Sequence, residues 1–127
     1  MTPEHTRRAR EILGAGPLLV PEQKVVLDSD PVRARAIGRP AVENPYLGLV
    51  NYTNNLRTLG FDDADLADGG SDRLIDALVV HGDAATVAKG LAQHLDAGAD
   101  QVAINLISPP GADPEPGYAA LAEALFR

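Results

Sequence analysis

The most regular pattern of apolar and polar positions in the chain lies between residues 84 and 95. Apolar side chains recur there at steps of three and four residues: Ala84, Val87, Ala88, Leu91, Ala92 and Leu95. This spacing places them on one face of an α-helix. Asp83 comes just before the pattern and can cap the first turn, and Gly98 follows it. The pattern therefore predicts an amphipathic helix from Asp83 to Asp96.

Two nearly continuous apolar runs predict β-strands. The first is Lys24–Leu27, which Pro21 restricts to begin after it or to sit at an edge, and the second is Val102–Ile107. Runs in which apolar residues do not alternate with polar ones are typical of parallel strands buried on both faces. The sequence therefore predicts an α/β fold with two neighbouring parallel strands.

Capping residues followed by proline mark further helices. Thr2-Pro3 opens one that is predicted to stop at Gly14, and Asp30-Pro31 opens another that runs through Ile37. Gly38 and Pro40 are predicted to interrupt the second helix. Helical stretches are also predicted over residues 46–60, 71–79 and 113–125, so that five or six helices surround two strands in a single domain, residues 1–127.

The amino-acid composition limits the cellular compartment and the kinds of partner that we expect for this protein. The chain has no cysteine, which excludes disulfides and thiolate chemistry, and its formal net charge is −7 with only two lysines. The chain lacks the clustered lysines and arginines that bind the phosphates of a nucleic acid. No segment approaches the roughly 18 apolar residues that a membrane helix requires. The polar start of the chain lacks a secretory signal. We therefore expect a cytoplasmic protein with no nucleic-acid partner and no membrane partner.

Neither a metal site nor a catalytic set can be assembled from the sequence. The three histidines are scattered, and His94 is predicted to lie on the exposed side of its helix. The acidic run 62–68 fails as a calcium loop, because its third, fifth and twelfth positions are Ala64, Leu66 and Arg73. No metal is expected, and no catalytic residue is assigned.

Five runs taken together carry a resemblance to a known family: residues 4–14, 18–27, 45–49, 51–61 and 68–102. In order and spacing they resemble the carboxy-terminal portion of luciferase-like monooxygenases, in the branch of coenzyme F-420-dependent oxidoreductases. The resemblance covers nearly the whole chain.

The resemblance implies a TIM-like (β/α)8 barrel in which Lys24–Leu27 is strand seven and Val102–Ile107 is strand eight. It further implies coenzyme F-420 or FMN as cofactor, and hydride transfer or monooxygenation of a small organic substrate. A complete barrel needs eight strand–helix units and roughly 250 residues. The family's cofactor contacts lie mostly on earlier strands, so this chain alone is expected to bind the cofactor poorly.

A second hypothesis belongs to another class of protein. The chain could be a catalytically inactive, truncated remnant that acts, if at all, through oligomerisation. The two hypotheses differ in whether Met1 is the natural start of the protein or the boundary of a longer one.

Six residues are candidates for binding substrate or cofactor. Asp28 follows the first predicted strand and Asn105 lies near the carboxyl end of the second, and active residues of barrels lie at and past these ends. The other four combine aromatic, amide and guanidinium groups suited to a polar substrate: Tyr52, Asn54, Asn55 and Arg57. The alternatives remain open that Asp28 is a solvated loop acid and that the run 52–57 is a surface helix.

A sheet of two strands is too small to stand alone in water, and its edges stay open. We therefore expect a homodimer or larger oligomer. Its interface is predicted around five apolar strand residues: Val25, Val26, Leu27, Ile104 and Leu106.

Overall fold

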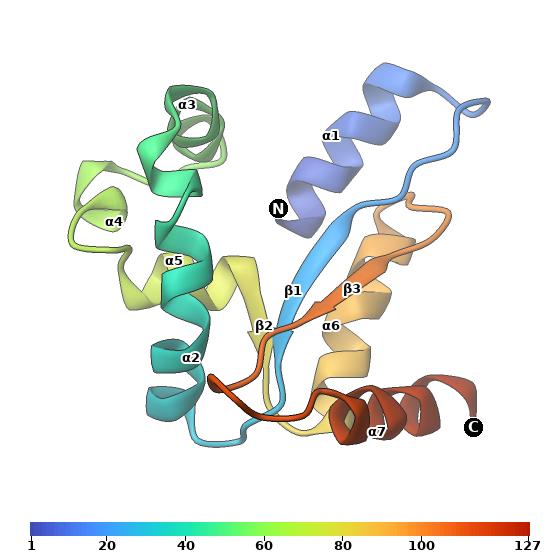
Figure 1. The fold of residues 1–127 in the computed structure, drawn as a ribbon. Coiled ribbons are helices and arrows are strands. Elements are labelled where there is room, and N and C mark those ends of the chain that lie inside the picture. The colour runs from blue at the N-terminus through green and yellow to red at the C-terminus, as the bar shows by residue number, and fades with distance from the viewer.

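A computed structural model describes all residues 1–127 and shows an α/β fold built on a three-stranded parallel sheet (Figure 1). The strands are β1 (Glu22–Val26), β2 (Val79–His81) and β3 (Ala103–Leu106), and their order in the sheet is β2-β1-β3. β1 pairs in parallel with both neighbours. The predicted parallel pairing of the first and last strands is confirmed, with Val25 opposite Leu106.

Strand β2 corrects the prediction of a two-stranded sheet. The sequence predicted a helix that includes Val79, whereas helix α5 (Asp72–Leu78) ends one residue earlier and Val79 pairs with Lys24 of β1. A short apolar run fits a helix or a strand equally well by its pattern alone. The β-branched side chains of Val79 and Val80 favour the strand, because they pack well on a pleated surface.

Seven α-helices and one 3₁₀ turn surround the sheet, more than the five or six predicted. Besides α5 they are α1 (Pro3–Leu13), α2 (Pro31–Glu43), η1 (Tyr46–Gly48), α3 (Val50–Thr58), α4 (Asp63–Leu66), α6 (Ala84–Asp96) and α7 (Glu115–Phe126). The predicted caps are confirmed: the Thr2 hydroxyl accepts from the His5 amide at 3.2 Å, and Asp83 accepts from the Thr86 amide at 2.8 Å. None of the helices is both long and apolar enough to cross a membrane.

Helix α2 runs without a break through Gly38 and Pro40, so the predicted interruption is wrong. Pro40 costs the helix one backbone hydrogen bond, but Gly38 serves close packing rather than a break. Ala34, Gly38 and Val42 are buried at four-residue steps. A β-carbon added at Gly38 would lie 3.0 Å from a methyl group of Val79, so the small residues let α2 approach the sheet closely.

Helices of the chain itself cover both faces of β1 in its second half. The neighbouring side chains Val25 and Val26 are fully buried and point to opposite faces. Figure 1 shows α2 to α5 on one side of the sheet and α6 with α7 on the other. Because Val25 and Val26 are enclosed by the chain itself, they cannot form the predicted interface between copies.

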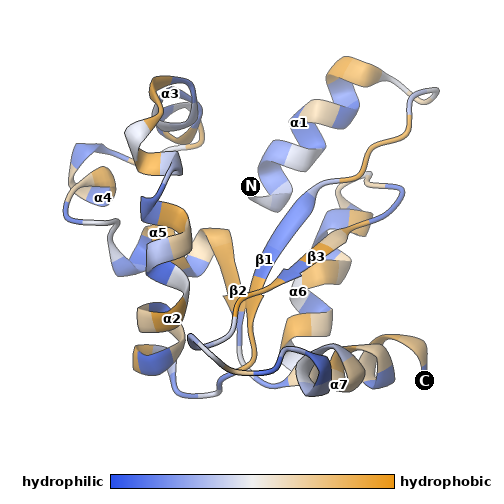
Figure 2. Cartoon of the chain, in the orientation of Figure 1, coloured by the Kyte–Doolittle hydropathy of each residue, from blue (hydrophilic) through white to orange (hydrophobic).

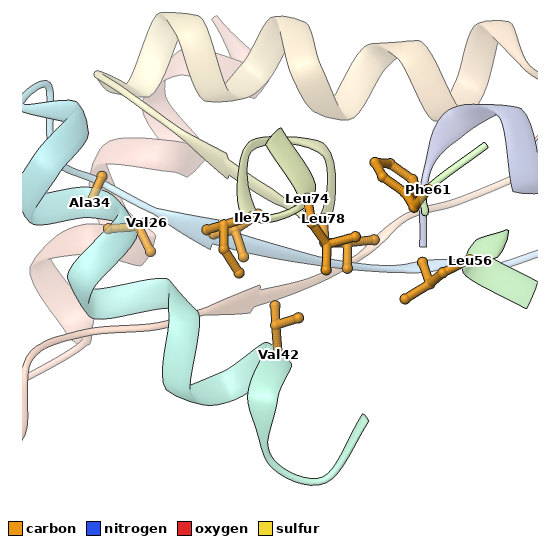
Figure 3. Close-up of a cluster of buried hydrophobic side chains, with 9 residues drawn as sticks. Val26, Ala34, Val42, Leu56, Phe61, Leu74, Ile75 and Leu78 are labelled. Atoms are coloured by element: carbon orange, nitrogen blue, oxygen red, sulfur yellow. The ribbon is translucent and has the colours of Figure 1, made fainter. Parts of the chain in front are cut away.

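The core on the α2–α5 side is the larger of the two (Figure 3). It consists of Val26, Ala34, Val42, Leu56, Phe61, Leu74, Ile75, Leu78 and Val79. The core on the other side consists of Val25, Val87, Leu91 and Leu121. Of the residues of α7, Leu121 is buried in this core, whereas Tyr118 and Ala122 are exposed.

Strand β3 is covered on one face only, which corrects the prediction that it is buried on both. Ala103 and Asn105 are exposed, whereas Ile104 and Leu106 are half-buried against the smaller core. β1 also changes along its length: Figure 2 shows it hydrophilic in its first half and hydrophobic in its second. The sheet therefore presents a polar, uncovered area where the first half of β1 lies beside β3.

Candidate functional site

A cavity of about 240 Å³ lies between α1, α3 and the first half of β1. Its polar lining comes from α1, β1, η1 and α3, and comprises His5, Thr6, Glu22, Lys24, Tyr46 and Tyr52. A second hollow, lined by His5, Asn51, Tyr52 and Asn55, adjoins it because the two share His5 and Tyr52. We call the two together the α1–α3 cleft.

Strand β1 supplies the charged groups of the cleft. Because side chains alternate along a strand, Glu22 and Lys24 share the face that looks toward α1 and α3. The Lys24 ammonium lies 2.9 Å from the Glu22 carboxylate and 4.5 Å from the centre of the Tyr46 ring. Asn105 donates to the same carboxylate at 3.2 Å. The bonds from Lys24 and Asn105 lower the pKa of Glu22, so this carboxylate stays ionised beside the Lys24 ammonium.

Two tyrosines form an aromatic wall of the cleft. The ring centres of Tyr46 and Tyr52 are 4.5 Å apart and their planes are tilted by 47°. Tyr46 comes from η1 and Tyr52 from the helix that follows it, so a short stretch of chain builds the wall. Rings at this separation and tilt attract each other and hold their positions.

His5 brings an ionisable group from α1. Its Nδ1 lies 3.2 Å from the side-chain nitrogen of Asn55. The Asn55 amide donates, so Nδ1 accepts and the proton of the neutral ring sits on Nε2. Burial lowers the pKa of His5, with Met1 and Arg8 contributing positive charge nearby. The ring is therefore a neutral hydrogen-bond donor at pH 7.

Three of the six predicted site residues gather at the cleft. Tyr52 and Asn55 line it directly, and Asn105 reaches it through its bond to Glu22. Tyr52 and Asn55 are three positions apart, which places them on one face of α3. Asn105 lies within β3 beside Lys24 rather than past the carboxyl end of its strand.

The other three candidates lie elsewhere. Asn54 and Arg57 bond to each other at 3.2 Å on the exposed side of α3, and Arg57 also pairs with Asp63 at 3.0 Å. Asp28 follows β1 and pairs with Arg33 at 3.0 Å, which lowers its pKa. The bonds of these side chains to charged neighbours agree with the structural alternatives left open by the sequence.

A buried polar network beside the cleft was not predicted from the sequence. His94 is fully buried on α6, contrary to the prediction that it is exposed. Its Nδ1 lies 2.8 Å from the Thr6 hydroxyl and its Nε2 lies 2.7 Å from the Gln23 side-chain oxygen. The amide nitrogen of Gln23 donates to the Leu78 carbonyl at 2.9 Å. One signal was present: His94 follows the buried Val87 and Leu91 at helical spacing.

The network fixes the protonation of His94. Since the Gln23 oxygen accepts, Nε2 carries the proton and Nδ1 accepts from the Thr6 hydroxyl. Burial lowers the pKa of His94 to about 4. The neutral imidazole therefore joins α1, β1 and α6 and holds the α1 wall of the cleft in place.

The cleft offers no free cation to the phosphate of the implied cofactors. FMN and coenzyme F-420 each combine a three-ring system with phosphate, and pockets for ligands of that size measure about 300–1,000 Å³. The two hollows of the cleft measure about 240 and 350 Å³, so their volume does not exclude such a ligand, but Lys24, the one lysine or arginine that lines them, is paired with Glu22. The chain also holds no cluster of His, Cys, Asp or Glu able to bind a metal ion. Phenol, imidazole and ammonium groups suit a small polar molecule instead.

Comparison with known proteins identifies no matching family model, no similar curated protein and no similar solved structure.

Proposed function

We propose that this chain is part of a cytoplasmic, luciferase-like oxidoreductase that uses FMN or coenzyme F-420. The α1–α3 cleft binds the small organic substrate of that enzyme, and the cofactor is held by strands outside this chain. The five sequence runs described above support the family. The observation that carries the substrate role is the meeting of Tyr52 and Asn55 with His5 and Lys24 around the two adjoining hollows of the α1–α3 cleft.

The parallel pairing of β1 with β3 supports the proposed barrel origin. In a barrel, strands seven and eight are neighbours, as β1 and β3 are here. The other neighbour of strand seven would be strand six, which comes before it in the chain. In this chain β2 pairs along that edge of β1, although it follows β1 in sequence. We infer that β2 takes the place left by the strand of the complete barrel.

The cleft residues would bind and orient the substrate. When bound elsewhere in the enzyme, the cofactor supplies hydride or activates oxygen. Tyr46 and Tyr52 offer an aromatic surface with two hydroxyl groups, and neutral His5 offers its Nε2 proton to a substrate oxygen. Lys24 has one bond to Glu22 and further ammonium protons for a carbonyl or hydroxyl group.

A fragment titration tests the substrate site. Small phenols, alcohols and aldehydes are added to the labelled chain, and amide chemical shifts are followed by NMR. We expect the shift changes to centre on His5, Tyr52 and Asn55, and Asn55→Ala to weaken binding several-fold because a donor is lost from the cleft. Asn54→Ala is the matched control, since Asn54 lies on the exposed side of the same helix. Equal weakening by both variants, or shifts confined to another surface, would contradict the proposal.

A second candidate function is supported by a different observation. Two large apolar side chains beside β3 are exposed: Leu95 by 50% and Phe126 by 85%. Exposed apolar patches on a protein often mark contact surfaces. This observation favours the alternative that the chain is a catalytically inactive remnant that acts through association with a second copy.

A further inference from the structure

The outer edge of β3 is open. β3 pairs with β1 alone, and it lies at the border of the sheet (Figure 1). The amides of Ala103 and Ile107 donate to β1 and the loop before it, so the alternate residues Ile104 and Leu106 turn their backbone groups outward. The Leu106 amide donates to the Tyr118 hydroxyl at 3.2 Å. Ile104 is thus the central residue of an unpaired strand edge.

This edge lacks the charges that usually protect open strands. No Asp, Glu, Lys or Arg occurs from Gln101 to Ala112. Natural proteins commonly guard edge strands with charged side chains, because an open row of amides and carbonyls otherwise pairs with another chain. Copies of a chain with net charge −7 repel each other over most of their surface. The uncharged edge is therefore a place where two copies can approach.

An apolar groove continues from the edge onto α6 and α7. It measures about 550 Å³ and is lined mainly by Leu91, Leu95, Val102, Ile104, Leu125 and Phe126. Figure 2 shows hydrophobic residues along β3 and at the C-terminal end of α7. The Phe126 ring stands at the rim with 85% of its surface exposed. The groove and the ring are complementary in chemistry, and each copy carries both.

We propose that a second copy of this chain docks on the β3 edge and the α6–α7 groove, around a two-fold axis at Ile104. The two β3 strands run antiparallel, and Ile104 exchanges both backbone hydrogen bonds with Ile104 of the partner subunit. The Phe126 ring of each copy enters the groove of the other, as a two-fold interface requires. The dimer then contains one continuous six-stranded sheet. This docking proposal does not depend on the oxidoreductase proposal.

The proposal predicts one dimer with a defined interface. Light scattering on the full chain from low micromolar to near-millimolar concentration should show a mass that rises from monomer to dimer. Amide hydrogen exchange by NMR should show that Ile104 is slowed as the dimer forms, because its amide becomes hydrogen-bonded. A monomer at every concentration, or a dimer in which the Ile104 amide still exchanges freely, overturns the proposal.

Substitutions at two residues of nearly equal exposure distinguish docking on this surface from non-specific association. Phe126→Glu places a charge in the groove of the partner and should weaken dimerisation at least tenfold. Ile12→Glu is the control, since Ile12 is 86% exposed but lies on α1, away from β3. Both side chains are outside the core, so both variants should keep the thermal midpoint of the monomer. Dissociation by Ile12→Glu with no effect of Phe126→Glu would overturn the proposal.

Discussion

His94 is the residue whose chemistry depends most on the surrounding structure. Its two ring nitrogens are both occupied, one by the Thr6 hydroxyl and one by Gln23, and its side chain is fully buried. A proton added at Nδ1 would put a positive charge inside the protein and displace the hydroxyl proton of Thr6. Burial therefore disfavours the charged ring and lowers the pKa of His94 to about 4.

The lowered pKa of His94 makes stability depend on pH. In the unfolded chain an imidazole titrates near pH 6.5, so below that value the unfolded state binds a proton that the folded state refuses. We expect the free energy of unfolding to fall as the pH drops from about 6.5 to about 4, by up to about 1.4 kcal/mol for each unit of pKa difference. Denaturant midpoints measured across this range check the prediction.

Two variants show which histidine causes the pH dependence of the free energy of unfolding. Burial also lowers the pKa of His5, so His5→Gln must be compared with His94→Gln. We expect His94→Gln to remove most of the pH dependence above pH 5 and His5→Gln to remove less. Asp65 does not confuse this range: bonds from Arg73 and Ser71 lower its pKa to about 2, so its contribution is lost only as the pH falls below about 4. A slope that survives in His94→Gln would contradict the assignment.

At the scale of elements, α6 anchors the smaller core. Its apolar face packs on the sheet through Val87 and Leu91, and Leu91 is 3% exposed. We expect Leu91→Ala to lower the free energy of unfolding by roughly 2–5 kcal/mol, since it empties a buried leucine site. Urea unfolding measures the change. Leu18→Ala is the control: Leu18 is 69% exposed, so its loss should cost little, and equal effects of the two variants would show that Leu91 is not part of the core.

Helices were easier to predict than strands, because their signals are local. The caps at Thr2 and Asp83 and the spacing of residues 84–95 are sufficient for α1 and α6, and both are confirmed. The roles of Gly38 and Val79 depend instead on contact between two elements, α2 and β2. A glycine that ends a helix and a glycine that lets a helix approach a sheet look the same in a sequence.

The candidate site, like the helices, could be predicted only where its residues lie close together in the sequence. Tyr52 and Asn55 were found because aromatic and amide groups cluster in one run, and helical spacing places both at the cleft. Lys24 and His5 were not assigned to it, because residues of β1 and α1 meet α3 only through the tertiary fold. The single polar residues Thr6, Gln23 and His94 carry no motif, and only their juxtaposition makes them a network.

At the scale of the whole molecule, the chain has no closed barrel, and its cleft offers no free cation to a flavin or deazaflavin. The sheet has three strands, its outer edges are not closed into a barrel, and the two hollows of the α1–α3 cleft measure about 240 and 350 Å³. Lys24 offers little free charge to a phosphate because it is paired with Glu22. A cofactor of this kind needs unpaired donors for its phosphate.

We therefore expect that the purified chain binds neither FMN nor coenzyme F-420 in the micromolar range. The measurement is a fluorescence titration of each cofactor, in its oxidised and its reduced form, with increasing protein. Lys24→Ala serves as the matched variant, since it removes the one lysine in the cleft. The expected result is no saturation for either protein. A micromolar dissociation constant that Lys24→Ala raises would mean that the cleft holds the cofactor after all, and that the substrate must bind elsewhere.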